Sequence, residues 1–310
     1  MPDNLLFRLQ TKIFSRLYID LNSRYQNSVL LSSLGRSGST LVSDVINYNN
    51  NYRVIFEPFK HDIVKAARPF VYPSFIPPDV KGYEHSKAID RILTGNIRGN
   101  WVDKDNRKVI ASKRLIKDIR TNLMLGWIRN NYPDLPIVLL VRNPFATIES
   151  WMRAKWPADI PKKRILEQAD LLAPILPEGI LETYAAADTA LKNHLFNWCI
   201  NYYIPLLNAE KNNIHVTVYE NYITNPDVEI KKLFDYLNIP FNNKVLHVSN
   251  KLSRTTRSDS PLKSGDNILT AWRKKFTETE ISDGIKILSM FGFDALYDYD
   301  TGLPKEIFTT

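Results

Sequence analysis

The fold is decided by the stretch Val29-Leu30-Leu31-Ser32-Ser33-Leu34-Gly35-Arg36-Ser37-Gly38-Ser39-Thr40. It predicts a buried strand over 28–33, a turn of small residues, and a helix over 40–47. A strand, turn and helix in this order direct several backbone N–H groups and the positive end of a helix dipole at one small volume. The stretch therefore predicts an anion-binding site at the turn.

This turn resembles a P-loop, whose pattern G-x-x-x-x-G-K-[ST] binds nucleotide phosphates. Where that pattern has Gly-Lys-Thr, this chain has Gly38-Ser39-Thr40, so the lysine is missing. A phosphate-binding loop without it is poorly equipped to split a triphosphate. We expect Arg36 to hold a nucleotide 5′ group instead, with help from the residues of the turn. These are Ser37, Ser39 and Thr40 with their hydroxyls, and Gly38 with its exposed backbone.

A second motif follows the apolar strand predicted over 137–141. Asn143 is suited to cap a helix and Pro144 to occupy its first position, so a helix is expected to begin there. Arg142 then lies at the carboxyl end of a parallel strand, where open α/β sheets bind ligands. Ser150 lies about two turns into the helix, and its hydroxyl can supplement the arginine.

The two motifs together resemble those of the sulfotransferases, which use 3′-phosphoadenosine 5′-phosphosulfate (PAPS). The turn at Arg36–Thr40 resembles their 5′-phosphosulfate loop, and Arg142 with Ser150 resembles their 3′-phosphate-binding signature. The resemblance implies PAPS as co-substrate and transfer of a sulfuryl group to an acceptor hydroxyl. It also implies a P-loop-like α/β fold, with a mostly parallel central sheet flanked by helices.

A third feature, Glu57-Pro58, follows the strand predicted over 52–56, at the same sheet edge as the turn. Sulfuryl transfer to a hydroxyl needs a base to take the acceptor proton. The pair resembles a Glu-Pro pair of carbohydrate-directed sulfotransferases, which implies Glu57 as the base and a carbohydrate or glycolipid acceptor. His61 is the rival base because the pKa of imidazole is better matched to neutral pH. The structural alternative is a Glu57 that caps a helix or forms a salt bridge near Arg36 or Arg53.

Fixed positive charge is needed on the transferring group and on the departing phosphate. Arg36 is the first candidate for this role. Lys113 and Arg114, directly after a strand predicted over 108–112, are the second. The loop at 261–266 loosely resembles the nucleotide-covering loop of the family, which implies that Lys263 reaches the 3′-phosphate. No His, Cys, Asp or Glu residues have metal-ligand spacing, so we expect no metal.

The rest of the chain alternates strands and helices, as in a mostly parallel sheet with helices on both faces. Residues 60–105 and 156–180 are rich in proline, and we interpret them as insertions on the acceptor side of a single domain spanning 1–310. The other predicted strand is 214–219, and the other predicted helices are 116–131, 144–153 and 183–208.

Composition limits the classes of partner. The 310 residues carry a net charge of +8, which favours anionic ligands, but no nucleic-acid-binding motif is present. The one cysteine, Cys199, has apolar neighbours and is expected to be a core thiol in a reducing compartment. No apolar run is long enough to span a bilayer, and the N-terminus lacks a signal-peptide pattern. We therefore expect a cytoplasmic enzyme.

Residues 1–27 include an amphipathic helical pattern, with apolar side chains at helical spacing and basic residues beside them. Such a helix usually packs on its own domain or on a second subunit. Peripheral contact with an anionic membrane is the alternative, favoured if the acceptor is a lipid.

Two other functions compete with the sulfotransferase interpretation. A nucleotide kinase with a degenerate P-loop would bind ATP with magnesium, but the missing lysine argues against it. A non-catalytic protein that binds a nucleotide or an anionic glycan would also suit the positive net charge. It would bind ligand without turnover.

Overall fold

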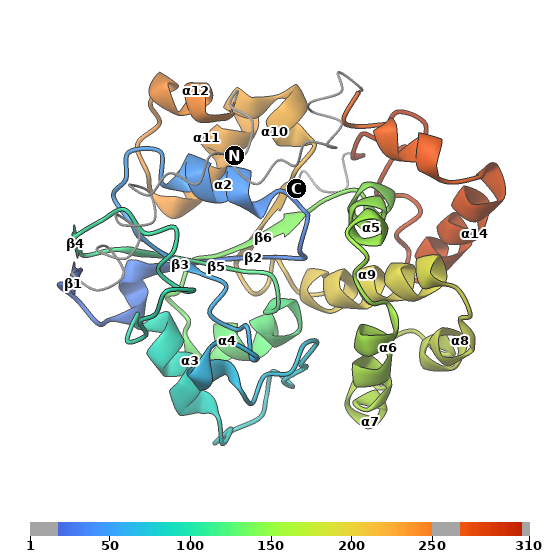
Figure 1. The fold of residues 1–310 in the computed structure, drawn as a ribbon, viewed down its shortest axis with the longest axis horizontal. Coiled ribbons are helices and arrows are strands. Elements are labelled where there is room, and N and C mark those ends of the chain that lie inside the picture. Colours follow the sequence, from blue (N-terminus) through green and yellow to red (C-terminus); the bar gives the residue numbers. More distant parts are fainter. Residues whose placement is uncertain (1–17, 250–266, 306–310) are drawn as a thin grey trace.

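The computed structural model describes residues 18–249 and 267–305. A central sheet lies between two layers of helices (Figure 1). Within these residues no helix combines the length and the hydropathy needed to cross a bilayer. The strands are β1 (Ile19–Asp20), β2 (Ser28–Ser33), β3 (Arg53–Phe56), β4 (Ile110–Ala111), β5 (Arg114–Asp118), β6 (Ile137–Val141) and β7 (Ile214–Val218).

The central sheet has five strands in the order β3-β5-β2-β6-β7, and every neighbouring pair is parallel. All carboxyl ends therefore meet at one edge, here called the carboxyl edge. The strands β2 and β6 are neighbours, with Ser33 opposite Leu140. The two sequence motifs, which follow these strands, consequently leave the sheet side by side.

Helices cover both faces of the sheet. The α-helices are α2 (Ser39–Ile46), α3 (Ser86–Leu93), α4 (Leu125–Asn131), α5 (Pro144–Arg153), α6 (Asp159–Leu166), α7 (Ala169–Leu172), α8 (Ile180–Ala186), α9 (Ala190–Leu206), α10 (Asn221–Thr224), α11 (Pro226–Leu237), α12 (Leu246–Ser249) and α14 (Glu278–Ser289). Short 3-10 turns are η1 (Tyr25–Asn27), η2 (Lys65–Ala67), η3 (Asn122–Met124), η4 (Asn243–Val245) and η5 (Ala271–Lys275).

Alternate residues of β2 enter two separate cores. Leu30 belongs to the larger core, which includes α4 and α9. Val29 and Leu31 belong to the smaller core, which includes α2 and α11. Because both faces of the strand are buried, its apolar residues Val29, Leu30 and Leu31 are consecutive rather than alternating. The single cysteine, Cys199, lies fully buried in the larger core, and burial raises the pKa of its thiol.

Most of the predicted elements are confirmed. The strands over 28–33 and 137–141 have the predicted bounds, as does the helix over 144–153. The strands over 52–56 and 214–219 and the helix over 40–47 differ only at their ends. The predicted α/β architecture with a parallel sheet is correct.

Three predicted elements differ from the structure. The segment 108–112 contributes only the two-residue β4, which pairs with β1 outside the central sheet. The missing central strand is β5, in a region that was assigned partly to a helix over 116–131; α4 begins only at Leu125. The helix predicted over 183–208 is divided into α8 and α9, because Thr189 caps α9 by accepting a hydrogen bond from Lys192 N–H.

Because β5 begins at Arg114, two residues that were candidates for stabilising charge do not lie at the carboxyl edge. Arg114 is the first residue of β5, so it lies at the amino edge of the sheet, where its guanidinium donates to Asp20 at 2.8 Å and to the Ser28 hydroxyl at 2.9 Å. Lys113 precedes it, and its ammonium lies 5.9 Å from the centroid of the Tyr52 ring. Neither can stabilise charge at the nucleotide site.

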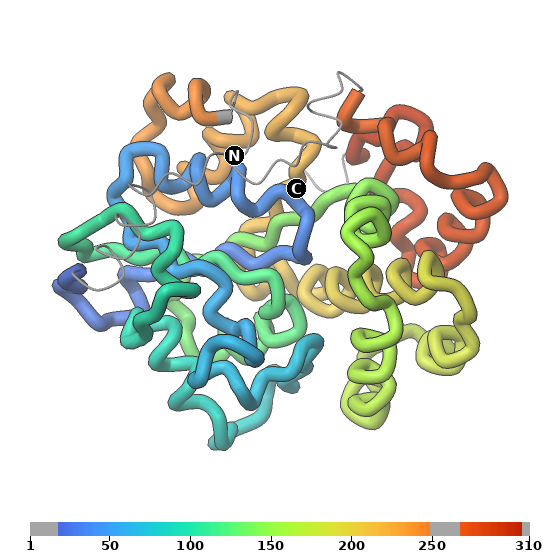
Figure 2. Tube along the Cα trace, viewed as in Figure 1, coloured from blue at the N-terminus to red at the C-terminus, as the bar shows by residue number. Residues whose placement is uncertain are grey.

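The N-terminal helix predicted within 1–27 is only partly testable. Residues 1–17, which carry its apolar stripe, lie outside the described residues. Residues 18–27 form β1 and η1 instead of one continuous helix. The two proline-rich segments, 60–105 and 156–180, lie on the same side of the sheet in Figure 2.

Candidate functional site

The turn between β2 and α2 opens at the carboxyl edge. Gly38 has φ = 92°, which is the left-handed region, and its carbonyl accepts the first helical hydrogen bond from Leu41 N–H at 2.9 Å. A Cβ at this position would lie 2.2 Å from the ring of Tyr219. Both the backbone conformation and the close packing therefore require glycine here. The N-terminus of α2 is the predicted anion site.

The structure joins the two sequence motifs directly. Arg36 Nε donates to the Ser150 hydroxyl at 2.9 Å, and Arg142 Nη1 donates to the Arg36 carbonyl at 2.9 Å. Arg36 has φ = 69°, in the left-handed region. Its side chain bonds Ser150 and its carbonyl bonds Arg142, so this one residue connects the two motifs. We expected Ser150 to assist Arg142; its described partner is Arg36.

The hydroxyls of the turn differ in their surroundings. Ser37 is fully buried, and its hydroxyl lies 3.4 Å from that of Tyr202, which itself donates to the Leu140 carbonyl at 2.9 Å. Ser37 is thus best placed to offer a ligand its backbone N–H. Ser39 is buried and Thr40 is half-buried at the first turn of α2.

Two tryptophans fix the start of the turn. Trp151 Nε1 donates to the Gly35 carbonyl at 2.7 Å. The ring of Trp156 stacks on that of Trp151, with centroids 6.1 Å apart and planes 14° from parallel. A Cβ at Gly35 would lie 2.4 Å from the Trp156 ring, so glycine is needed for this contact. Trp156 stays 40% exposed and forms an apolar surface beside Arg36.

A pair of residues after β7 supports both motifs. The Arg142 guanidinium lies 4.5 Å from the centroid of the Tyr219 ring, the same ring that packs on the turn. Glu220 accepts hydrogen bonds from Asn143 N–H at 3.0 Å and from the Tyr297 hydroxyl at 3.3 Å. Burial raises the pKa of Glu220 to about 7. Nothing in the sequence indicated these contacts.

Glu57 lies at the carboxyl edge, directly after β3. Its carboxylate accepts a hydrogen bond from Arg120 at 3.0 Å, and its side chain is 12% exposed. Its carbonyl accepts from Trp101 Nε1 at 3.1 Å, and its φ is 40°. Glu57 therefore forms a salt bridge, as the structural alternative predicted, and its partner is Arg120. The pair fixes the carboxylate at the edge of the site.

His61 is four residues further on, in the same loop. Burial lowers the pKa of its imidazole, and among the described residues no group bonds its buried Nδ1. The neutral form is thus favoured at pH 7, which is the form that accepts a proton.

Lys117 and Asp118 end the central strand β5 and were missed from the sequence because this region was assigned to a helix. Lys117 is 5% exposed, and burial lowers its pKa; no described residue forms a hydrogen bond or ion pair with its ammonium. Asp118 accepts N–H donors of Phe59 and Arg120, both at 2.8 Å, and burial raises its pKa to about 6. Asp118 thus fixes the two loops that carry Glu57 and its partner.

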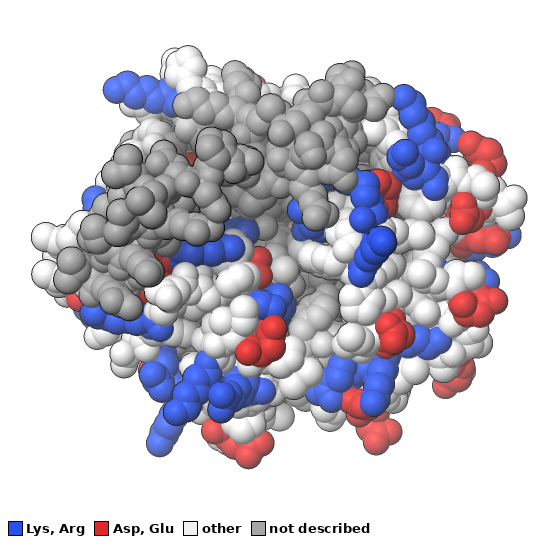
Figure 3. All heavy atoms as spheres, viewed as in Figure 1, with Lys and Arg blue, Asp and Glu red and all other residues white. Residues whose placement is uncertain are grey.

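These residues fit a ligand with two anionic groups. Arg142 Nε is buried with no hydrogen-bond acceptor among the described residues, although it lies at the predicted 3′-phosphate site. Arg36 belongs to the turn at the predicted 5′ site, and Lys117 ends β5, the strand beside β2, with its ammonium 4.4 Å from the centroid of the Phe56 ring. Figure 3 shows this face hollowed near its middle, with Lys and Arg side chains beside the hollow. Lys263 lies outside the described residues.

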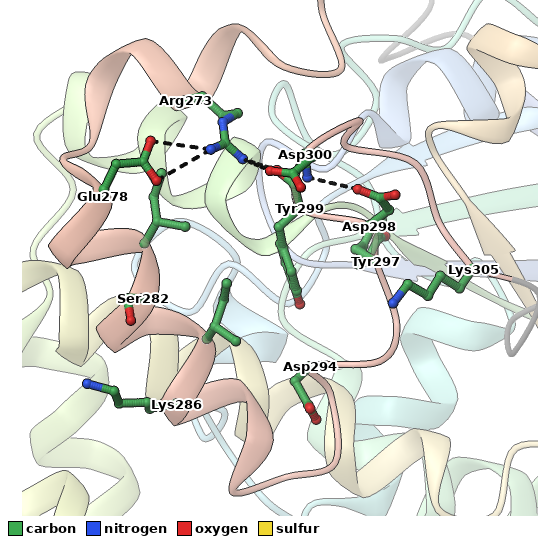
Figure 4. A pocket seen from close by; sticks show the side chains of 12 residues that line it. Arg273, Glu278, Ser282, Lys286, Asp294, Tyr297, Asp298, Tyr299, Asp300 and Lys305 are labelled. Carbon is green, nitrogen blue, oxygen red and sulfur yellow. Dashed lines mark hydrogen bonds and ion pairs between the residues drawn. The ribbon is translucent and has the colours of Figure 1, made fainter.

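A separate pocket of about 570 Å³ lies between α14 and residues 294–305 (Figure 4). Its Arg273 is neutralised by Asp300 at 2.9 Å and by Glu278 at 3.3 Å. None of the predicted catalytic or nucleotide-binding residues lines it. Among the described residues, no three His, Cys, Asp or Glu side chains are grouped to hold a metal ion.

Comparison with known families agrees with the site. Residues 26–279 match the family model described as "Sulfotransferase domain", and the chain belongs to this family. It is a sulfotransferase with PAPS as co-substrate. This assignment decides against the nucleotide kinase and the non-catalytic binding protein. No curated protein sequence matches the chain.

The chain is also similar to solved structures, all at low identity. A sulfotransferase domain from the curacin biosynthetic pathway is 15% identical, with a TM-score of 0.45, over 89% of this chain and 99% of that one. Mouse sulfotransferase SULT7A1, solved with PAP, is 13% identical, with a TM-score of 0.43, over 90% and 88%. The Mycobacterium avium sulfotransferase STF9 is 8% identical, with a TM-score of 0.44, over 86% and 76%.

Proposed function

We propose that this sulfotransferase moves the sulfuryl group to a hydroxyl of a carbohydrate or glycolipid, with Glu57 as the general base. The observation that carries the proposal is the 3.0 Å ion pair of Glu57 with Arg120, which fixes a carboxylate at the carboxyl edge. The Glu-Pro pair after the second strand of the sequence supports the carbohydrate class.

Each side chain then has a distinct part. PAPS, when bound, supplies the sulfuryl group and leaves as adenosine 3′,5′-bisphosphate. Glu57 takes the proton of the acceptor hydroxyl as its oxygen bonds to sulfur and the bond from sulfur to the phosphate oxygen breaks. Arg36 and Lys117, with the N–H groups at the start of α2, stabilise charge on the transferring group and the departing phosphate. Arg142 holds the 3′-phosphate.

The two proline-rich segments are proposed to form the acceptor side of the site. Gln168 Nε2 donates to the Pro73 carbonyl at 2.9 Å, and Gln168 Oε1 accepts from Phe75 N–H at 2.8 Å. Segments 60–105 and 156–180 therefore contact each other. Trp156, exposed beside the turn, offers an apolar surface on which the face of a sugar ring can pack.

The test is a panel of neutral, acidic and lipid-linked sugars incubated with PAPS, following adenosine bisphosphate release and acceptor mass. We expect a sulfated carbohydrate product, and we expect Glu57→Gln to lower kcat by about 10²–10⁴-fold. Sulfation of phenols or sterols with no carbohydrate product would contradict the acceptor class.

His61→Ala is the matched variant in the same loop. It removes the rival base, and we expect it to retain most of the turnover. Full turnover in Glu57→Gln together with its loss in His61→Ala would transfer the role of base to the histidine.

A further inference from the structure

A second concave surface lies along the outer edge of the sheet, beside β3. It is a groove of about 840 Å³ between η2, α3 and the segment 96–102. Three cationic side chains line it, namely Lys65, Arg91 and Arg98, and no Asp or Glu does. Such a single-sign lining favours an anionic ligand, because nothing within the groove neutralises the field.

The segment that lines the groove is bonded to β3. The Ile97 carbonyl accepts a hydrogen bond from the guanidinium of Arg53, the first residue of the strand. The Val102 carbonyl accepts from the N–H of Phe56, the last residue, at 2.7 Å. The lining is therefore fixed to the sheet, and its three cations can meet more than one anionic group.

The groove reaches the candidate base. Trp101, which lines it, donates from Nε1 to the Glu57 carbonyl at 3.1 Å. Two further cations approach this tryptophan: Lys104 Nζ lies 4.4 Å and Lys60 Nζ 5.5 Å from the centroid of its ring. Positive charge consequently continues from the groove to the loop that carries Glu57, although Lys60 is paired with Asp62 at 2.9 Å.

One of the lining cations, Arg98, packs on an aromatic ring and forms no ion pair within the described part of the chain. The Arg98 guanidinium lies 4.4 Å from the centroid of the Tyr18 ring, and Arg53 lies 3.8 Å from the same centroid. Tyr18 is 3% exposed, so this contact is fixed by the fold. An arginine positioned in advance loses little freedom when it binds an anion.

We propose that this groove binds the anionic part of the acceptor, a carboxylated or already sulfated sugar chain extending from the hydroxyl that is sulfated. This identification of the ligand rests on the carbohydrate acceptor proposed above. A polynucleotide is disfavoured because the groove offers one tryptophan and no series of aromatic rings for bases. A flat membrane surface does not reach the floor of a concave groove.

The test combines Arg91→Glu with Arg98→Glu. The matched control combines Lys81→Glu with Lys87→Glu, two exposed cations of the same insertion that do not line the groove. Binding to a chondroitin sulfate hexasaccharide, with maltohexaose as the neutral probe, is measured by calorimetry on each protein with adenosine 3′,5′-bisphosphate present. Thermal unfolding checks that both variants are folded.

We expect the Arg91/Arg98 variant to weaken hexasaccharide binding at least tenfold and the Lys81/Lys87 variant less than twofold. Affinity for the nucleotide is expected to stay unchanged in both. Equal weakening by the two variants would mean a general charge effect and would overturn the proposal, as would unchanged binding.

This binding experiment is independent of turnover. If the hexasaccharide binds through Arg91 and Arg98 but no sugar is ever sulfated, the groove proposal stands and the proposed acceptor class fails. If neutral sugars are sulfated and the hexasaccharide does not bind, the proposed acceptor class stands and the groove proposal fails.

Discussion

The two edges of the central sheet use positive charge in opposite ways. At the amino edge, Arg53 is fully buried and donates to Asp103 at 2.9 Å and to the Gly95 carbonyl at 2.7 Å. At the carboxyl edge, Lys117 is also buried, with its ammonium 4.4 Å from the centroid of the Phe56 ring and no hydrogen bond or ion pair to a described residue. The hydrogen bond from Arg142 goes to a neutral carbonyl. Arg120 is paired with Glu57 at 3.0 Å, so the contrast between the edges rests on Lys117 and Arg142, which we propose serve an anionic ligand.

The amino edge offers the largest expected effect. Arg53→Ala leaves Asp103 buried without its cation, and removal of one partner of such a pair costs about 3–5 kcal/mol. Chemical denaturation should show this loss in the free energy of unfolding, with little change for Arg98→Ala, since Arg98 is exposed.

A double variant, Arg53→Met with Asp103→Leu, keeps this prediction testable if the single variant fails to fold. Because no buried charge is then left unpaired, we expect it to be more stable than Arg53→Ala. If the double variant were as unstable as Arg53→Ala, the arginine would stabilise the fold only through its hydrogen bonds to the Gly95 and Ile97 carbonyls.

At the carboxyl edge the effect is expected on activity. Arg36→Ala removes positive charge from the proposed 5′ site and should lower kcat by about 10²–10³-fold. Its free energy of unfolding should change by less than about 1.5 kcal/mol, the scale of one hydrogen bond. Steady-state kinetics with PAPS, beside denaturation curves, measures both.

Arg36→Lys is the control for this prediction, since it keeps the charge but not the bond geometry that reaches Ser150. It should fall between the wild type and Arg36→Ala in activity. If Arg36→Ala lowered the free energy of unfolding and left kcat unchanged, Arg36 would serve the fold as Arg53 does, and the proposed difference between the two edges would be wrong.

The smallest expected effect concerns pH. The pKa of Glu220 is raised to about 7 from an ordinary value of about 4.5, so between these pH values the folded protein binds a proton that the unfolded chain releases. The free energy of unfolding therefore falls as pH rises across this window, by at most about 3 kcal/mol, and levels off above it.

Glu220→Gln, which keeps an acceptor for Asn143 N–H, should flatten this decline. Urea denaturation at pH 5, 6, 7 and 8 tests it. The contribution of Asp118, whose pKa is raised to about 6, has the same sign and remains in both proteins. Parallel curves for the two proteins would show that Glu220 does not titrate in this window.

The contrast between the edges also explains what the sequence could predict. The strand β6 is an uninterrupted apolar run, and β2 has three consecutive apolar residues between serines, because both faces of each strand are buried. Both strands were predicted with correct bounds. In β5, Arg114, Lys117 and Asp118 interrupt the run. Their burial depends on partners supplied by distant segments, which local periodicity does not contain.

The same limit applies to the site. The residues of both motifs were found because each motif is local, and their proximity followed from a parallel sheet. The pairing of Arg36 with Ser150 depends on which strands are neighbours, so it was not predictable from either motif. The partner of Glu57 was missed for the reason that β5 was missed, because Arg120 follows that strand.

One contact gives the C-terminal segment a role at the carboxyl edge. Tyr297 lies far along the chain from both motifs, yet its hydroxyl donates to the carboxyl group of Glu220, whose other oxygen accepts from the N–H of Asn143, the N-cap residue of α5. The start of α5 is therefore anchored by a segment that is synthesised much later than the motif it supports. A chain that ended before Tyr297 would contain both motifs and lack this anchor.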